Sequence, residues 1–422
     1  MRTWACFLIS ALTILLLPPP AARADEAGLR ATVELLAGPR MAGRGSGTPE
    51  GRAAADYLAQ RLATAGLRPA FADSYQQEFL LRGQGWTGED LTGKRGVNVA
   101  GILPGAGRLA DRYVVVGAHH DHLGHLDASL AGTGSALPGS FYAGANDNAS
   151  GVAVVLDLLD NLPPPQGPDR RALLVVFFGG EEVGLQGSGH FIREPAVPLS
   201  AIDAMINFDT VGQMQGRKLY VSGIGTTAAF PPLVRAANTA GLELSLAQGG
   251  WSGSDHMAFN TAEVPVLFIF GGPYPQYNTP EDTPETLDYG AMNLIVDYAG
   301  RLVQSVRALP GDLPWVMVAR KLRPEMGAGA NRDTWFGSLP DFTEEVEGYQ
   351  LAGVFDGSPA QKAGLLKGDV LVRLGGQPVT DLASFTTALR AHAPGDLVEV
   401  TVLRRGRSLN FTVVLGNRKD RR

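Results

Sequence analysis

The chain is almost free of cysteine: among its 422 residues the only one is Cys6, in the apolar start of the chain. Once that start is removed, the protein has no thiol, no disulfide and no cysteine metal ligand. The chain also lacks any cluster of Lys or Arg, and its net charge of −6 argues against a nucleic-acid partner. Metal ligands, if there are any, must therefore be imidazole and oxygen groups.

The apolar start is also too short to be a comfortable membrane span. Arg2 precedes the apolar stretch 4–17, and residues 22–24 read Ala-Arg-Ala, which is an A-x-A cleavage pattern. We expect residues 1–24 to be a cleaved signal peptide, with an uncleaved anchor as the alternative. Because Cys6 is not beside the cleavage site, lipidation is not expected. The mature protein is then exported, periplasmic or extracellular, with no stable membrane span.

Two domains are expected from the order of patterns along the chain. Strand-like and helix-like segments alternate over residues 25–310, which predicts an α/β domain with a mixed, mostly parallel sheet flanked by helices. Residues 311–335 are rich in Pro, Gly and scattered charges and are expected to be a linker, with one docked strand at 315–319. Residues 336–418 contain short strands and two helices, which predicts a small β-rich domain.

Several local signals place individual elements in the first domain. Thr48, followed by proline and an acid, predicts a helix start that continues to Gly66. Residues 97–103 predict a strand. A helix is expected from Ser150 to Leu162, with Ser150 as its cap. Residues 123–145 form a long Gly-, Ala- and Ser-rich segment, which we expect to be a functional loop over the site.

Acidic and imidazole residues stand where apolar runs end. The runs are 113–118, 173–180 and 205–208, and they are followed by His119, by Glu181 and Glu182, and by Asp209. Unbroken apolar runs of this length predict strands buried on both faces of a parallel sheet. Ligands bind to such sheets at the carboxyl ends of the strands. Asp147 lies between them, just before a helical stretch. Imidazole with carboxylate suits zinc, so the pattern predicts a metal site.

The second domain resembles a PDZ domain. The likeness is carried by Gly357-Ser358-Pro359-Ala360, Ala363-Gly364-Leu365, Lys367-Gly368-Asp369-Val370-Leu371 and Gly375-Gly376. It implies a groove in which an extended peptide adds a strand. The loop that grips a terminal carboxylate would be Phe336, Gly337, Ser338 and Leu339, which departs from the usual Gly-Leu-Gly-Phe pattern. The alternative is a domain that packs on the first one and binds no peptide.

The first domain resembles the secreted bacterial zinc aminopeptidases of the co-catalytic two-metal type, some of which carry a C-terminal PDZ domain. Five segments in order carry the likeness: 117–124 (GAHHDHLG), 144–151 (GANDNASG), 180–188 (GEEVGLQGS), 207–212 (NFDTVG) and 254–256 (SDH). The resemblance implies a zinc exopeptidase-like fold acting on peptides or proteins. The protease-associated insertion of some members is absent, because too few residues separate 70 from 97.

The resemblance also implies a role for each matched residue. His119 and Asp209 would bind one zinc ion, Asp147 would bridge both ions, and Glu182 would bind the second. Asp121 would hold the other ring nitrogen of His119 and so fix the tautomer of this ligand.

One position departs from the family. Members place a histidine just before a Thr/Arg-Pro-Glu/Ser-Asp-Thr segment to close the second metal site, whereas this chain has Asn278 there. An amide oxygen is a weak neutral ligand, so we expect one or two zinc ions per chain, with the second held loosely, replaced by a harder ion or missing. The preceding Tyr277 is retained and would stabilise the oxyanion.

Glu181 would be the general base.

The other histidines have plainer interpretations. Of the four histidines between 119 and 125, we favour His119 as a ligand because it ends its strand, and we expect most of the others to be loop or surface residues. His120 is a minor alternative. His256 is expected to shape the substrate pocket, with a metal role as its alternative.

Three functions are compatible with these patterns. The leading one is a metal-dependent aminopeptidase. The second is a different exported metal enzyme, such as a carboxypeptidase or a single-zinc enzyme like glutaminyl cyclase. The third is a non-catalytic protein that has lost its second metal and binds peptides through the PDZ groove.

Overall fold

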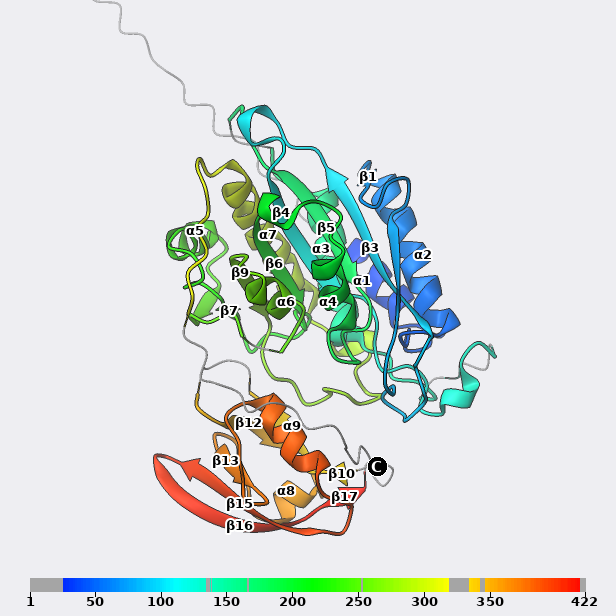
Figure 1. Ribbon diagram of the computed structural model, residues 1–422, viewed down its shortest axis with the longest axis vertical. Helices are drawn as coiled ribbons and strands as arrows, with labels where there is room; N and C mark the ends of the chain where they lie inside the picture. The colour runs from blue at the N-terminus through cyan, green and yellow to red at the C-terminus, as the bar shows by residue number, and fades with distance from the viewer. Residues whose placement is uncertain are drawn as a thin grey trace, which may run out of the picture.

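The computed structural model describes residues 26–133, 137, 139–164, 167–251, 253–318, 334–341 and 346–417. The expected signal peptide, Cys6 and much of the expected linker lie outside these residues. The described chain forms a larger α/β unit and a smaller β-rich unit (Figure 1), which confirms the fold class expected from the sequence. Along the described residues, no helix combines the length and the apolar character needed to cross a bilayer.

A mixed sheet of nine strands, counted over the described residues, forms the centre of the larger unit. They are β1 (Arg68–Pro69), β2 (Gln76–Leu80), β3 (Arg95–Leu103), β4 (Tyr113–His119), β5 (Ala172–Phe178), β6 (Ile202–Asp209), β7 (Lys218–Ser222), β8 (Glu243–Leu246) and β9 (Val266–Phe270). Their order is β1-β3-β5-β4-β6-β9-β7-β8, and β2 also pairs with β3. The central strands β5, β4, β6 and β9 are parallel, whereas β3 and β7 pair antiparallel with the outer two of these.

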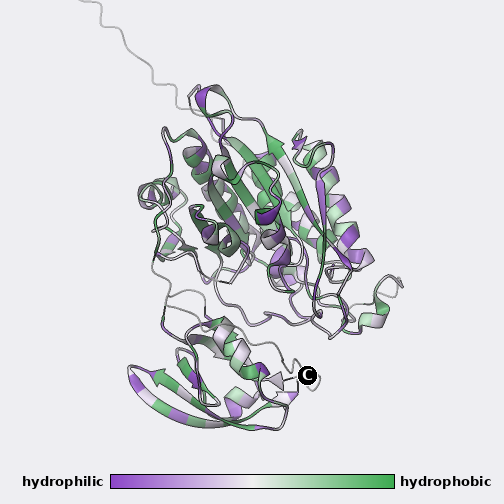
Figure 2. Ribbon diagram, in the orientation of Figure 1, coloured by the Kyte–Doolittle hydropathy of each residue, from purple (hydrophilic) through white to green (hydrophobic). Residues whose placement is uncertain are grey.

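Helices cover both faces of this sheet, so that its central strands are buried. The helices are α1 (Glu26–Leu36), α2 (Pro49–Thr64), α3 (Gly151–Asp160), α4 (Gln186–Arg193), α5 (Phe230–Ala237), α6 (His256–Thr261) and α7 (Tyr289–Ala308), with short helical turns at Gly107–Leu109, Leu199–Ala201 and Pro284–Thr286. One core joins the sheet to α1, α2, α3, α5 and α7, and a second joins it to α4 and α6. Every residue of β5 and β6 is buried, and the central strands of the sheet are mostly green, the hydrophobic colour, in Figure 2.

The helix starts illustrate one correct and one wrong expectation. The hydroxyl of Thr48 accepts the backbone N–H of Gly51 (3.1 Å) and caps α2, as expected. Ser150 does not cap α3, because its own backbone is already helical and its hydroxyl donates to the carbonyl of Asn146 (2.7 Å). The amide oxygen of Asn148 instead accepts the N–H of Gly151 (3.0 Å).

The two segments expected to be irregular are each anchored to the larger unit. Within 123–145, which contains the short turn η2 (Ala128–Leu130), the N–H of Gly132 donates to Glu50 at the start of α2 (2.5 Å). In the expected linker, the N–H of Val316 donates to the Thr226 carbonyl (2.8 Å). Residues 315–318 are therefore docked, but the expected strand is absent from them, and residue 319 lies outside the described chain.

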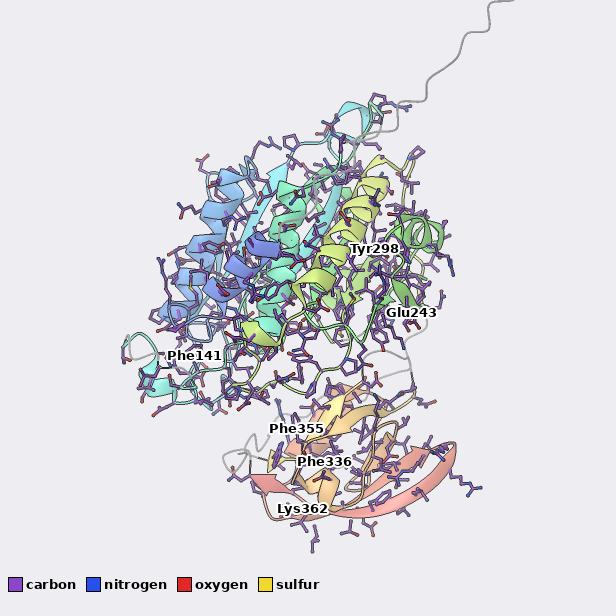
Figure 3. All side chains as sticks on the ribbon, turned by 180° about the vertical axis from the view of Figure 1, so that it is seen from behind. Phe141, Glu243, Tyr298, Phe336, Phe355 and Lys362 are labelled. Atoms are coloured by element: carbon purple, nitrogen blue, oxygen red, sulfur yellow. The ribbon has the colours of Figure 1, made fainter. Side chains whose placement is uncertain are left out.

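The smaller unit has its own sheet and core. Its strands are β10 (Thr334–Trp335), β11 (Ser338–Pro340), β12 (Tyr349–Val354), β13 (Val370–Leu374), β14 (Gln377–Pro378), β15 (Leu397–Arg404), β16 (Arg407–Val414) and β17 (Gly416–Asn417), and its helices are α8 (Pro359–Lys362) and α9 (Leu382–Arg390). The main sheet has the order β11-β12-β13-β15-β16. The expected hairpin of β15 and β16 is confirmed. Phe336, labelled in Figure 3, is buried in a core with residues of β12, β13, α9 and β15.

An ion pair with one fully buried partner ties β13 to β15. Asp369 has no exposed surface, accepts from Arg404 Nε and Nη2 (2.6 and 2.7 Å), and accepts the N–H of Leu366 (2.9 Å). We predict that Asp369→Asn destabilises this unit by about 2 kcal/mol, because charge-assisted hydrogen bonds at a buried oxygen are lost. Amide hydrogen exchange in β13 and β15 should then accelerate about 30-fold.

The exposed Asp356, which contacts only Gln361 among the described residues (2.8 Å), provides a matched control. Asp356→Asn should change the exchange rates little, since surface substitutions usually cost less than about 0.5 kcal/mol. Equal effects of the two variants would contradict the role given to Asp369.

Candidate active site

The expected site residues converge at the carboxyl ends of neighbouring parallel strands. The chain leaves β4 at His119, passes through α3 to β5 on one side, and returns through α4 to β6 on the other side. His119 lies level with Phe178 at the end of β5, and Asp209 ends β6. This reversal of strand order is the kind of position at which open α/β sheets bind ligands.

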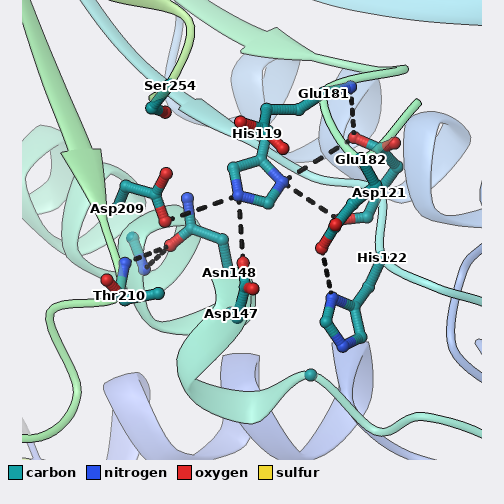
Figure 4. Close-up of polar contacts among 12 residues, drawn as sticks. His119, Asp121, His122, Asp147, Asn148, Glu181, Glu182, Asp209, Thr210 and Ser254 are labelled. Carbon is teal, nitrogen blue, oxygen red and sulfur yellow. Dashed lines mark hydrogen bonds and ion pairs between the residues drawn. The ribbon is translucent and has the colours of Figure 1, made fainter. Parts of the chain in front are cut away.

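His119 is held between carboxylates on both sides of its ring (Figure 4). Its Nε2 lies 3.2 Å from Asp147 Oδ1 and 3.5 Å from Asp209 Oδ1. Its Nδ1 donates to the backbone carbonyl of Asp121 (3.1 Å), and the carboxylate of Asp121 lies 3.7 Å away. Since Nδ1 carries the proton in this contact, Nε2 of the neutral ring is left to face the two carboxylates as a potential ligand.

A second imidazole, which the sequence did not single out, lies beside the same carboxylates. His122 is 2% exposed, and its Nδ1 lies 2.7 Å from Glu182 Oε1. His122, Asp147 and Glu182 form one group whose ligand atoms lie within 4.8 Å of one another. His119, Asp147 and Asp209 form another such group, so that Asp147 is shared between the two.

The expectation that most histidines of this segment are loop or surface residues is correct for the loop, because His120, His122 and His125 lie outside the helices and strands, but none of them is at the surface. His119, His120, His122 and His125 are all buried, with at most 4% of each exposed. His120 lies outside both of these groups and outside a third one, formed by His119, Glu181 and Glu182, and it donates from Nε2 to the Val97 carbonyl (2.9 Å). Burial lowers the pKa of His122 to about 4, against the opposing influence of nearby Asp147, so its ring is neutral near pH 7.

The donor set fits zinc. Zinc binds imidazole nitrogen and carboxylate oxygen at about 2.0–2.2 Å, so two ligands on one tetrahedral ion are about 3.4 Å apart. The separations of 3.2 and 3.5 Å around His119 Nε2 match that spacing. Two such groups that share Asp147 could hold a pair of ions, with His119 and Asp209 at one and Glu182 and His122 at the other.

Glu181 stands beside this cluster on the turn after β5. Its N–H donates to the carboxylate of Asp121 (3.2 Å), and it lines the same pocket as His119. Burial raises the pKa of Glu181 well above its usual range, and repulsion from Glu182 adds to this, although His119 opposes it. A raised pKa suits a group that must take up and release a proton near neutral pH.

The pocket around these groups has charged and apolar walls. The residues that line it are His119, Asp147, Glu181, Glu182, Asp209, Thr210, Gly253, Phe268, Phe270, Pro273, Tyr274, Tyr277, Leu339 and Pro340. Leu339 and Pro340 belong to β11 of the smaller unit. None of the lining residues comes from the described part of 123–145, the segment expected to be a functional loop over the site.

The remaining expected residues lie at the edge of the cluster. Tyr277 lines the pocket, and burial raises the pKa of its hydroxyl well above the usual value, so it stays protonated. His256 is buried and stacks on Phe268, with ring centroids 4.5 Å apart, and lies outside the three groups. Asn278 follows Tyr277 in a left-handed backbone conformation (φ 56°), and its role as a ligand stays a prediction.

A buried guanidinium holds the loop that carries Asp147. Arg44 has no exposed surface and donates to the carbonyls of Ala143 (2.8 Å), Gly144 (2.7 Å) and His120 (2.8 Å). No sequence motif marks this residue, because an arginine that binds backbone carbonyls has no pattern of its own. The hydroxyl of Ser46 likewise links Asp121 (2.9 Å) to the N–H of Gly180.

Asp282 holds the same loop from the other side. Its carboxylate accepts the N–H groups of Asn146 (2.8 Å) and Asp147 (3.0 Å) and the hydroxyl of Tyr274 (3.1 Å). Burial raises its pKa to about 6, and these backbone hydrogen bonds oppose the shift. In the sequence, Asp282 is marked only as part of the family segment that follows Asn278.

Comparison with known proteins agrees with the geometry. Residues 98–303 match the model of Peptidase family M28, and residues 341–415 match that of the PDZ domain. Aminopeptidase YwaD of Bacillus subtilis is 34% identical over 157 residues, which are 34% of this chain and 34% of that protein. A probable leucine aminopeptidase of Arthroderma benhamiae is 28% identical over 222 residues, 49% of this chain and 57% of the relative. The chain thus spans between a third and three fifths of these relatives.

The fold is shared with a solved structure. The structure of BSAP, a zinc aminopeptidase from Bacillus subtilis, superposes with a TM-score of 0.54 at 18% identity, covering 69% of this chain and 98% of that one. At this identity the likeness concerns the fold alone.

The position of Asp282 gives a prediction. Asp282→Ala should lower the free energy of unfolding of the metal-free protein by about 3 kcal/mol, because two buried backbone N–H groups lose their acceptor. The neighbouring Glu281 is exposed, and Glu281→Ala should cost less than about 0.5 kcal/mol. Urea unfolding of both variants in chelator tests this, and equal midpoints would show that Asp282 does not hold the loop.

Sequence match and fold lead to one assignment. The matched residues 98–303 contain the central parallel strands and every residue that is labelled in Figure 4. The matched residues 341–415 contain β12 to β16 of the smaller unit. The chain therefore carries a domain of peptidase family M28 followed by a PDZ domain.

Proposed function

We propose that this protein is an exported, zinc-dependent aminopeptidase that removes residues from the N-termini of peptides. The observation that carries the proposal is the pair of ligand groups that share Asp147 within a pocket that also contains Glu181. The aminopeptidase names of YwaD and of the Arthroderma benhamiae relative agree with it. Export rests on the sequence of residues 1–24.

The proposed roles follow from the position of each group. His119 and Asp209 would hold one zinc ion, Asp147 would bridge, and Glu182 would hold the second. Bound zinc would polarise the scissile carbonyl and lower the pKa of a water molecule. Glu181 would accept a proton from the attacking water and deliver it to the leaving amine. The protonated hydroxyl of Tyr277 would donate a hydrogen bond to the oxygen on which negative charge develops.

The side chains of the pocket favour an N-terminal substrate over a C-terminal one. No Lys or Arg is among the described residues that line it. A carboxypeptidase needs a cation for the terminal carboxylate of its substrate, and this lining supplies no such side chain. The apolar walls formed by Phe268, Phe270 and Leu339 fit an apolar first side chain.

The PDZ domain contributes to this pocket in the proposed function. Leu339 and Pro340 lie on β11, which stands at one end of the sheet order. This is the segment in which the resemblance places the peptide-gripping loop. We propose that the PDZ domain contacts the substrate at the mouth of the pocket and does not act as a distant tether.

Replacing the proposed base tests the mechanism. Glu181→Gln should lower kcat for a leucyl anilide by a factor of about 10³ or more, because the amide has no basic oxygen to take the proton. Zinc content should be unchanged, since Glu181 is not a ligand in this scheme. Turnover that survives Glu181→Gln with zinc still bound would refute the mechanism.

Blocked substrates separate the proposed activity from its competitors. A peptide with a free N-terminus and an amidated C-terminus should be hydrolysed, and the same peptide with an acetylated N-terminus and a free C-terminus should not. The opposite preference would indicate a carboxypeptidase, and cyclisation of an N-terminal glutamine without hydrolysis would indicate a glutaminyl cyclase-like enzyme. Capture of peptides without turnover by the zinc-loaded protein would indicate the non-catalytic alternative. Mass spectrometry of the products distinguishes all four.

A further inference from the structure

We propose that His122 is the imidazole ligand of the second metal ion. The proposal rests on the metal-dependent function proposed above and deepens it. It answers a question that the sequence leaves open, because position 278 offers only a neutral amide. The observations that carry it are the position of the His122 ring, its burial and the contacts that fix it.

The ring faces the two carboxylates expected at the second metal. Its Nδ1 lies 2.7 Å from Glu182 Oε1, and the ligand atoms of His122, Asp147 and Glu182 lie within 4.8 Å of one another. The group supplies one imidazole nitrogen and two carboxylates, and three is the number of protein ligands that catalytic zinc sites use. Both carboxylates also line the pocket.

The ring is packed in this position from behind. A Cβ on Gly144 would lie only 2.3 Å from His122 Cδ2, so the ring rests directly against the backbone of the loop that carries Asp147. Tyr142 contacts the ring edge-on, with centroids 6.5 Å apart, and the N–H of His122 donates to the Arg44 carbonyl (3.4 Å). These contacts hold ring and carboxylates together before any metal arrives, which lowers the cost of binding.

The paired nitrogen of His122 faces a different kind of group from that of its neighbour His120. Both rings are equally buried, and each has one ring nitrogen without a partner among the described residues, Nε2 in His122 and Nδ1 in His120. The other nitrogen of His120 donates to the Val97 carbonyl (2.9 Å), and this residue belongs to no group of potential ligands. The other nitrogen of His122 faces the Glu182 carboxylate within such a group, so of these two histidines His122 is the one placed to bind a metal.

Cobalt-substituted protein provides a test that reports ligation directly. In the NMR spectrum of a Co²⁺-loaded protein, each imidazole bound to the metal gives a hyperfine-shifted, solvent-exchangeable N–H signal. We expect two such signals in the wild type, from His119 and His122, and one in His122→Gln. The matched control His120→Gln should keep both signals.

Zinc binding provides the second measurement. Titration of the metal-free proteins should give two zinc equivalents for the wild type and for His120→Gln. In His122→Gln the second equivalent should bind at least about 100-fold more weakly, since even partners of ligands change affinity by that much. Thermal unfolding in chelator should show His122→Gln still folded, because the ring has only one hydrogen bond to lose.

Either of two results overturns the proposal: a single exchangeable hyperfine-shifted signal in the wild type, or two that persist in His122→Gln. The first would mean that His122 only orients Glu182, and the second would place another histidine on the metal. Neither result bears on the aminopeptidase proposal, which is tested separately by the effect of Glu181→Gln on turnover.

Discussion

Repulsion among buried carboxylates is the constraint on which the site depends. A ligand oxygen of Asp147 and one of Glu182 lie within 4.8 Å of each other, and two unit charges at that separation repel by roughly 3.5 kcal/mol at an effective dielectric constant of 20. Burial and this repulsion raise the pKa of Glu182 well above its usual range. A divalent cation between the carboxylates would convert the repulsion into attraction. Without a metal, the fold therefore keeps these carboxylates close together with no cation to neutralise them.

The surrounding structure is organised to keep that arrangement from relaxing. Strand pairing fixes His119 and Asp209, because both are the last residues of buried parallel strands. The loop with Asp147 has no such support and is held from two sides. Arg44 donates to carbonyl groups of this loop, and Asp282 accepts hydrogen bonds from N–H groups of the same loop. Nearby carboxylates also offset much of the cost of burying the Arg44 charge, although burial still lowers its pKa. Two charged side chains that hydrogen-bond to the backbone of this loop thus position the shared carboxylate.

What the sequence could predict depends on how regular the supporting structure is. His119, Glu181, Glu182 and Asp209 follow apolar runs, and parallel strands bring their ends to one edge, so their meeting was predictable from the chain. The Ser150 cap was wrong, and so was the strand expected at 315–319 over its described residues 315–318, because tertiary contacts decide both. The Ser150 hydroxyl accepts the N–H of Val211, and the N–H of Val316 donates to the Thr226 carbonyl. The role of Arg44 could not be predicted from the sequence. Its partners are backbone carbonyls, one of them 100 residues away, and such contacts produce no recognisable sequence motif.

The position of the His122 ring could not be predicted from its place in the sequence. In an extended strand, side chains alternate between faces, and this places His119 and Asp121 on the site and sends His120 to Val97 on the other face. Continued alternation would send His122 away as well. The strand, however, ends at His119, and His122 pairs with Gly45 in an isolated parallel bridge. In this conformation its ring lies beside Glu182. In the proposed site, the four consecutive residues 119 to 122 would supply a ligand, a structural histidine, an orienting acid and a second ligand.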